Sequence, residues 1–280
     1  MVKFSLVFCF LFISASFIDF AVATKKTVGY YEIKKGDISV TVTNYGATIL
    51  SIKVPDNKGG HRGFGDVFWT VKNHQKDGQN PHITLTYDSF DGEQGFPGDL
   101  SVSVTYKLMK YNKLAVIMKA KPLNKATPVN LAQHTYWNLG GHNSGNILQN
   151  KIQIFGSQIT PVDEELLPTG EITSVKNTPY DFLKPQLIGS RIDQLSSGYD
   201  INYVLNGPIN SIIRKAAKFY TGNKLDNVKG KNGVVYKAHA GFCLETQGIP
   251  DAVNHPNFPS QIVNPGETYR HFMLYKFSAS

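Results

Sequence analysis

Cysteine is scarce in this chain, which has only Cys9 and Cys243 among its 280 residues. Cys9 lies in a largely apolar stretch, Phe4–Phe20, which follows Lys3 and ends just before the small residues Ala21-Val-Ala23. A charged start, an apolar centre and an Ala-x-Ala end are typical of a cleaved signal peptide, and an uncleaved signal anchor is the alternative. Cleavage would leave Cys243 alone, which excludes an internal disulfide and leaves stability to core burial.

The chain also lacks linkers, low-complexity runs and sustained internal repeats. We therefore expect a signal peptide over residues 1–23 and one domain over residues 24–280, with a secreted, endomembrane or extracellular location. Asn-x-Ser/Thr sequences are absent as well, so N-glycosylation is not expected.

Sequence signals for metals, phosphates and polyanions are weak. Glycine-rich phosphate loops are absent, and the pair His239 and Cys243 has no further cysteine or histidine at metal-ligand spacing. The net charge of +8 would allow binding to acidic cell-wall polysaccharide or nucleic acid. However, the lysines are spread along the whole chain without interleaved aromatic residues, which favours a solvated surface. The sequence thus predicts no metal and no nucleic-acid partner.

Period-two patterning dominates the secondary-structure signal. Three segments, Ile38–Val42, Leu100–Tyr106 and Leu114–Met118, are rich in β-branched and aromatic residues and are bounded by turn residues. This pattern predicts an all-β fold, an antiparallel β-sandwich.

The segment Asn130–Gly140 places His134 among amides and the aromatic residues Tyr136 and Trp137. Aromatic rings pack on the C–H face of a pyranose, amides bind its hydroxyls, and an imidazole transfers protons near neutral pH. The segment therefore suits a sugar site, and the alternative is a buried histidine in an aromatic core.

Two further segments contribute carboxylates. Glu245 and Gln247 lie two residues apart in a strand-like apolar run, so their side chains should share one face. A carboxylate is costly to bury on such a strand unless it is paired or functional. Asp200 adds a second acid from a separate segment, Gly198–Tyr203.

At these residues the chain resembles the aldose 1-epimerases, or galactose mutarotases, and the resemblance is close to plant members. The resemblance runs from about Val28 to Phe277. Besides the segments above it includes Phe90-Asp-Gly-Glu-Gln-Gly-Phe-Pro-Gly-Asp-Leu100, Thr127–Asn130, Ile159–Pro161, Thr178–Phe182, Phe219-Tyr-Thr-Gly-Asn223 and Asn264–Gly266.

The resemblance implies a large twisted antiparallel β-sandwich with a sugar cleft on one sheet, here in truncated form. It implies the roles of general acid for His134, general base for Glu245 and hydroxyl-binding carboxylate for Asp200. Gln247 would contact the sugar, and Tyr136 or Trp137 would stack on it. The implied reaction interconverts the α and β anomers of free aldohexoses such as glucose and galactose, without metal or organic cofactor. We expect a monomer that binds a small hexose, and no membrane contact after signal cleavage.

The chain departs from the family pattern at two places. Between Asn57 and Gly63 it lacks a block that carries an Asn-Arg pair and a second histidine, and Lys58 stands where that histidine would be. His61 and Arg62 lie beyond the following Gly-Gly pair, so these roles are not assigned to them. A second block is missing before Phe219, where Lys218 replaces a sugar-binding glutamine. Its remnant, residues 209–218, has apolar spacing that is more helical than extended.

These losses leave an alternative open: a catalytically impaired carbohydrate-binding paralogue, or an incorrectly spliced gene model. A phosphosugar epimerase is less favoured because no arginine cluster marks a phosphate site.

Overall fold

The computed structural model describes residues 27–36, 38–47, 63–206 and 216–278. Across these residues the protein consists of strands and short 3₁₀ helices, without an α-helix. Within this described part of the chain, no helix is long and apolar enough to cross a bilayer. The expected signal peptide and the shortened join between Asn57 and Gly63 lie outside the described residues, except for Gly63 itself.

One five-stranded antiparallel sheet has the order β18-β6-β5-β4-β3. Strand β5 alternates buried and partly exposed residues along almost its whole length, as expected for a sheet with one face on the core. Two of the three predicted strands, Leu100–Tyr106 and Leu114–Met118, fall in this sheet. Its strands are β3 (Thr70–Gln75), β4 (His82–Ser89), β5 (Leu100–Met109), β6 (Lys113–Pro122) and β18 (Tyr269–Lys276).

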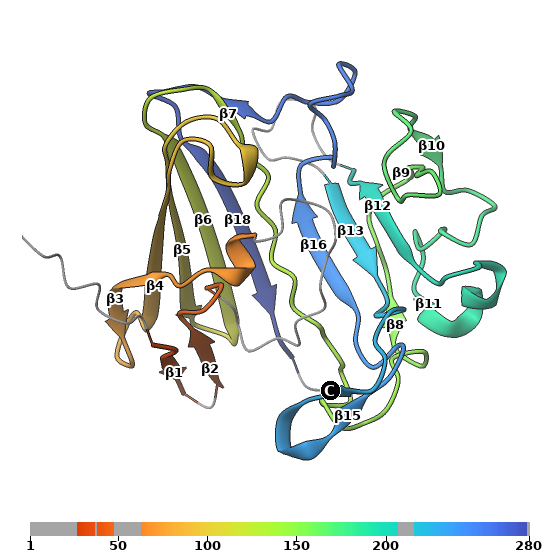
Figure 1. The fold of residues 1–280 in the computed structure, drawn as a ribbon. Helices are drawn as coiled ribbons and strands as arrows, with labels where there is room; N and C mark the ends of the chain where they lie inside the picture. Colours follow the sequence, from red (N-terminus) through yellow and green to blue (C-terminus); the bar gives the residue numbers. More distant parts are fainter. Residues whose placement is uncertain (1–26, 37, 48–62, 207–215, 279–280) are drawn as a thin grey trace, which may run out of the picture.

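The second five-stranded sheet is also antiparallel, with the order β10-β9-β12-β13-β16. Figure 1 shows the two sheets next to each other, with β18 of the first and β16 of the second nearest the middle. The strands of the second sheet are β9 (Gln158–Thr160), β10 (Thr173–Ser174), β12 (Asp200–Val204), β13 (Ala216–Tyr220) and β16 (Cys243–Gln247).

The described residues also form four separate two-stranded sheets, β1-β2, β8-β11, β14-β15 and β7-β17. Their strands are β1 (Tyr30–Lys35), β2 (Ile38–Thr43), β7 (Thr127–Pro128), β8 (Lys151–Ile152), β11 (Gln186–Leu187), β14 (Val228–Lys229), β15 (Val235–Tyr236) and β17 (Ile262–Val263). The 3₁₀ helices are η1 (Phe64–Asp66), η2 (Glu93–Gly95), η3 (Ile188–Ser190), η4 (Ile192–Gln194) and η5 (Lys231–Gly233).

Each large sheet has its own hydrophobic core. The first sheet packs its inner face, which includes the fully buried Tyr106 and Leu85, against β1 and β2. The second core is aromatic: the ring centroids of Phe219 and Tyr199 are 5.2 Å apart, and those of Phe182 and Tyr199 are 5.1 Å apart. Such aromatic clusters bury large apolar areas and hold the second sheet in register.

The all-β prediction is confirmed, and one local prediction is wrong. The apolar spacing of residues 209–218 indicated a helix, yet Ala216, Ala217 and Lys218 belong to β13. This strand is paired on both sides, with β12 and β16, so sheet hydrogen bonds outweigh the local helical spacing. Residues 209–215 lie outside the described part of the chain.

Candidate active site

Strand β16 carries the first elements of the site. Its alternation turns Cys243, Glu245 and Gln247 to one face, where their exposed fractions are 0%, 5% and 9%. Apolar and β-branched neighbours favour the extended conformation, and the period of two then fixes which side chains share a face. Glu245 and Gln247 therefore lie on one side of the strand, as predicted from their spacing.

Strand pairing places a row of polar side chains beside Glu245. Lys218 of β13 lies opposite Glu245, and Asn202 of β12 lies opposite Lys218. Thr160 of β9 extends the row, and the Asn202 amide donates to its hydroxyl over 3.2 Å. Directly opposed residues have Cβ atoms about 4.5–5.5 Å apart, so the row forms a continuous polar surface across four strands.

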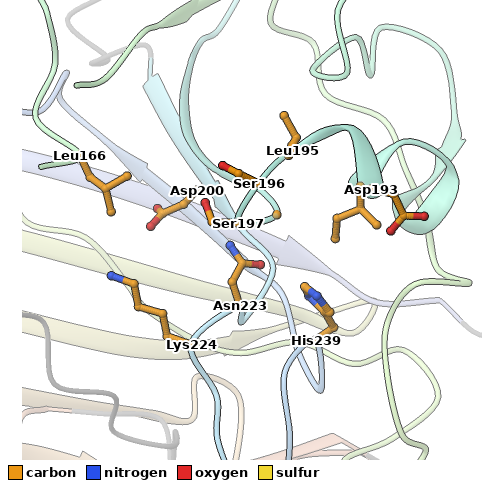
Figure 2. A pocket seen from close by; sticks show the side chains of 11 residues that line it. Leu166, Asp193, Leu195, Ser196, Ser197, Asp200, Asn223, Lys224 and His239 are labelled. Atoms are coloured by element: carbon orange, nitrogen blue, oxygen red, sulfur yellow. The ribbon is translucent and has the colours of Figure 1, made fainter. Parts of the chain in front are cut away.

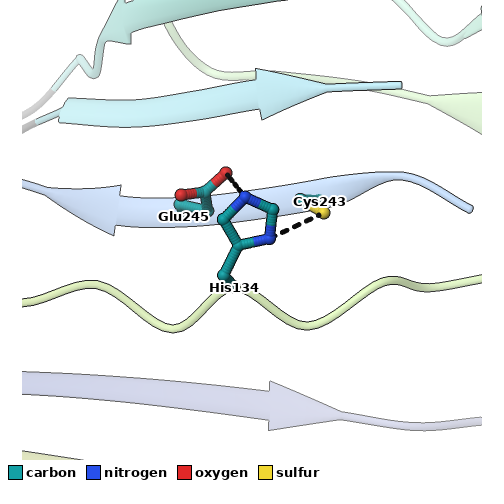
Figure 3. A group of neighbouring side chains, drawn as sticks. All are labelled: His134, Cys243 and Glu245. Atoms are coloured by element: carbon teal, nitrogen blue, oxygen red, sulfur yellow. Dashed lines mark hydrogen bonds and ion pairs between the residues drawn. The ribbon is translucent and has the colours of Figure 1, made fainter. Parts of the chain in front are cut away.

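His134 reaches this surface from a coil that runs alongside β16. Backbone hydrogen bonds between Trp137 and Phe242 join the coil to the residue just before the strand. The His134 ring then lies between two β16 side chains, as Figure 3 shows. Its Nε2 is 3.5 Å from Glu245 Oε1, and its Nδ1 is 3.5 Å from Cys243 Sγ. The histidine side chain is 46% exposed and that of Glu245 only 7%, so one partner faces the cleft while the other is set into the sheet.

Cys243 is a buried, neutral thiol. Burial raises the pKa of the Cys243 thiol well above its usual range, and the nearby Glu245 carboxylate adds to this, while the Lys218 ammonium opposes it. A thiol that stays protonated is a poor nucleophile. The side chain therefore contacts His134 without supplying a reactive thiolate.

Cys243 should resist alkylation in the folded protein. We expect iodoacetamide at pH 8 to leave it largely unmodified in native protein and to modify it fully after unfolding, because the reagent needs an accessible thiolate. Peptide mass spectrometry would measure the modification at this residue. A Ser174→Cys variant serves as the control, because position 174 is exposed and its thiol should react in the native state. Native labelling of Cys243 at the same rate would contradict its burial.

Asp200 lies at the start of β12 and is ion-paired inside the same site. Lys218 Nζ is 2.8 Å from Asp200 Oδ1, and both side chains are largely shielded from solvent. The same lysine is the register partner of Glu245 on the neighbouring strand β16. A sugar hydroxyl that binds Asp200 must share it with this cation.

These residues line a cleft of about 770 Å³. Volumes of this size are typical of small-molecule sites, which occupy about 300–1,000 Å³. A second cavity of about 330 Å³ shares Asp200 and Leu166 with the cleft, and Figure 2 shows Ser196, Ser197 and Asn223 around it. The predicted residues His134, Glu245, Asp200 and Gln247 all line the larger cleft.

Tyr136 and Trp137 are not among the residues that line either cavity. Trp137 packs against Tyr275 and Phe277, with ring centroids 5.2 and 5.5 Å away. Tyr136 stacks beside His134 at 5.2 Å, and burial raises the pKa of its phenol far above the usual value. A stacking role for the two rings stays a prediction, whereas their observed contacts are with the protein.

The donors around His134 do not fit a single metal ion. His134, Cys243 and Glu245 offer one ligand atom each within 4.8 Å of one another. However, Nδ1 faces Cys243 and Nε2 faces Glu245, so the two neighbours meet opposite ring nitrogens. A metal bound by all three would need one ring nitrogen directed at a shared centre. The arrangement fits an acid–base pair instead.

Comparison with known proteins identifies the family. The aldose 1-epimerase family pattern matches residues 57–276. The chain belongs to the aldose 1-epimerase family. It is 40% identical over 269 residues to galactose mutarotase from Homo sapiens, covering 89% of this chain and 76% of the relative. It is 32% identical over 247 residues to aldose 1-epimerase from Escherichia coli K12, covering 79% and 70%.

Solved structures show the same fold. The GalM/aldose epimerase homologue from C. elegans superposes with a TM-score of 0.79 at 21% identity, over 90% of this chain and 99% of that one. Galactose 1-epimerase from Lactobacillus acidophilus gives 0.73 at 21% identity, over 90% and 98%. The sequence resemblance to the family is thus confirmed, and family membership supports an isomerase that interconverts sugar anomers.

Sequence reasoning missed several residues that line the cleft of this family member. Asn202 follows Asp200 by two residues, so the period of two could have placed it on the same face. Thr160 and Phe96 also line the cleft, but their places depend on strand order and loop packing. The ion pair between Lys218 and Asp200 could not be predicted, because it requires the pairing of β12 with β13.

Proposed function

We propose that this protein interconverts the α and β anomers of free aldohexoses, with galactose and glucose as substrates. His134 acts as general acid and Glu245 as general base, and Asp200 binds sugar hydroxyls. The relatives named galactose mutarotase support galactose as a substrate. The observation that carries the proposal is the 3.5 Å approach of His134 Nε2 to Glu245 Oε1 at a sugar-sized cleft.

The reaction needs two proton transfers at one ring. Glu245 takes the proton of the C1 hydroxyl while His134 protonates the ring oxygen, so the C1–O5 bond breaks and the aldehyde forms. Rotation about C1–C2 presents the other carbonyl face, and reversed proton transfers close the ring to the opposite anomer. Positioned acid and base groups of this kind typically contribute about 10²–10⁴-fold each. Substrate insertion would separate the two side chains that now contact each other.

Anomer exchange provides the direct test. Freshly dissolved α-D-galactose should approach its equilibrium rotation faster in the presence of the purified protein than in buffer, as measured by polarimetry. Exchange at the buffer rate would refute the proposal. Binding of methyl β-D-galactopyranoside, whose ring cannot open, should be measured in parallel because it reports an intact sugar site without turnover.

One observation favours a second candidate, a carbohydrate-binding protein with impaired catalysis. Lys218 is ion-paired with one carboxylate oxygen of Asp200. This carboxylate is therefore less available to orient a sugar for proton transfer. Misplacement of a substrate by about 1 Å can cost about 10²-fold in rate. Methyl galactoside binding without anomer exchange would select this candidate.

Asp200→Asn should raise the KM for hexose by about tenfold or more and change kcat much less. Hydrogen bonds to charged groups are worth about 1.5–3 kcal/mol, and we expect this contact to act mainly in the ground state. Polarimetric initial rates over a range of sugar concentrations would separate the two parameters. An Asp226→Asn variant, at an exposed residue that lines neither cavity, is the matched control. A loss confined to kcat would assign Asp200 to the chemical step instead.

We further propose that residues 1–23 direct secretion and that the mature protein is a monomer. N-terminal sequencing of the exported protein should begin at Thr24, and sedimentation should give the mass of one chain. A retained N-terminus would favour the signal anchor.

A further inference from the structure

The outer face of the first large sheet carries a concentration of positive charge. Residues that alternate with the buried ones on β5, β6 and β18 point away from the core. None of the cations among them makes an ion pair with another described residue, whereas the whole chain has a net charge of only +8. They are Lys107, Lys113, Lys119, Lys121, Arg270 and Lys276, of which the last four are exposed.

Strand pairing places several of these cations directly opposite one another. Lys119 of β6 lies opposite Arg270 of β18, and Lys113 lies opposite Lys276 at the other end of the same strand pair. Like charges directly opposite each other destabilise a sheet. The nearest carboxylate on this face that aligns with one of the cations is Asp88 of β4, which is two strands away from Lys121. Asp88 already accepts a hydrogen bond from Ser101. Among the described residues no carboxylate pairs with these cations, although Lys113 Nζ lies 5.9 Å from the centroid of the Tyr111 ring.

An apolar strip separates the two basic ends. Phe272 and Leu274 of β18 are 57% and 48% exposed, and they lie opposite the partly exposed Ile117 and the buried Ala115 of β6. The strip is mostly aliphatic, with one aromatic ring. A pyranose can lay its C–H face on such a surface, whereas nucleic-acid bases stack on aromatic rings. The face therefore combines charge at its ends with a sugar-compatible centre.

We propose that this face, formed by β5, β6 and β18, binds a linear carboxylated polysaccharide. Eight residue steps from Lys113 to Lys121 span about 27 Å at ~3.4 Å per residue, which matches several sugar units of an extended chain. Carboxylates meet the opposed cations at each end, and pyranose rings cover the Phe272 strip. The surface is separate from the cleft at Glu245, so this binding does not depend on anomer exchange.

Calorimetric titration of the full chain tests the proposal, with polygalacturonate as the acidic probe and neutral galactan of similar length as its comparison. We expect binding to polygalacturonate alone, weakening steeply with salt. The double variant Lys119→Ser/Arg270→Thr should lose about tenfold or more in affinity. Phe272→Ser should weaken binding severalfold while keeping the salt dependence.

The matched control removes the same charge elsewhere. Lys229→Ser/Lys237→Thr deletes two exposed lysines of another region and should keep affinity within about twofold. Thermal melts complete the set, because the Lys119/Arg270 variant should melt no lower than the parent once like charges are gone. Equal losses in the two double variants would overturn the proposal in favour of diffuse charge attraction. Equal or tighter binding to polyuridylate, or to vesicles containing phosphatidylserine, would overturn it in favour of a different partner.

Discussion

Glu245→Gln and His134→Asn should each lower kcat for anomer exchange by about 10²-fold or more while leaving hexose binding within roughly tenfold. Each substitution keeps the approximate shape of the side chain and removes its ability to transfer a proton. We expect kcat to fall more than binding because proton transfer acts in the transition state. Asp200 and the row of polar side chains beside Glu245 would bind the sugar in the ground state. Saturation-transfer NMR between the α and β signals of galactose would measure the exchange rate. The affinity for methyl galactoside would show whether the sugar site is intact.

Matched variants away from the cleft test whether a loss of activity comes from the site or from a general loss of structure. Glu164→Gln and His82→Asn change the same residue types at positions that do not line either cavity, and both should exchange anomers at the parental rate. Melting temperatures must accompany the kinetics. If Glu245→Gln kept near-normal exchange, the acid–base assignment would be wrong. The carbohydrate-binding candidate would then be favoured. If it lost rate and melting temperature together, Glu245 would have a structural role.

Phe219→Ala should destabilise the protein by about 3–5 kcal/mol, the range for removing a buried aromatic side chain. Phe219 lies on β13 next to Lys218, is fully buried and contacts the rings of Tyr199 and Phe182. Urea unfolding followed by tryptophan fluorescence would give the free energy of unfolding. Phe155→Ala, at a position 66% exposed, provides the comparison and should change it by less than about 1 kcal/mol. A small effect at Phe219 would mean that the core refills the space.

Much of the fold follows from local alternation. The predicted strands at Ile38–Val42, Leu100–Tyr106 and Leu114–Met118 all lie within observed strands, β2, β5 and β6. Their patterns are readable because one face of the sheet is buried and the other is not. In the second sheet, the run that became β16 was already strand-like in sequence. Ala216 and Ala217 indicated the wrong structure because pairing on both sides decides their conformation.

The site was predictable only in part. Spacing alone put Glu245 and Gln247 on one face, but the meeting of His134 with Glu245 followed from family resemblance and not from any local pattern. Strand register adds information that the sequence does not carry. The lysines are scattered in the sequence, yet antiparallel pairing brings Lys113 opposite Lys276 from distant parts of the chain. No period in a single strand reveals which residue of another strand will face it.

The thiol beside His134 differs in kind from the partners that usually hold a catalytic imidazole. A backbone carbonyl or a carboxylate only accepts hydrogen bonds, so it suits Nδ1 only while that nitrogen carries a proton. The Cys243 Sγ, 3.5 Å from Nδ1, can accept a bond from a protonated ring and donate its own hydrogen to an unprotonated nitrogen. The contact is therefore compatible with either protonation state of Nδ1, and under the proposed mechanism it would keep Nε2 directed at Glu245 in both states.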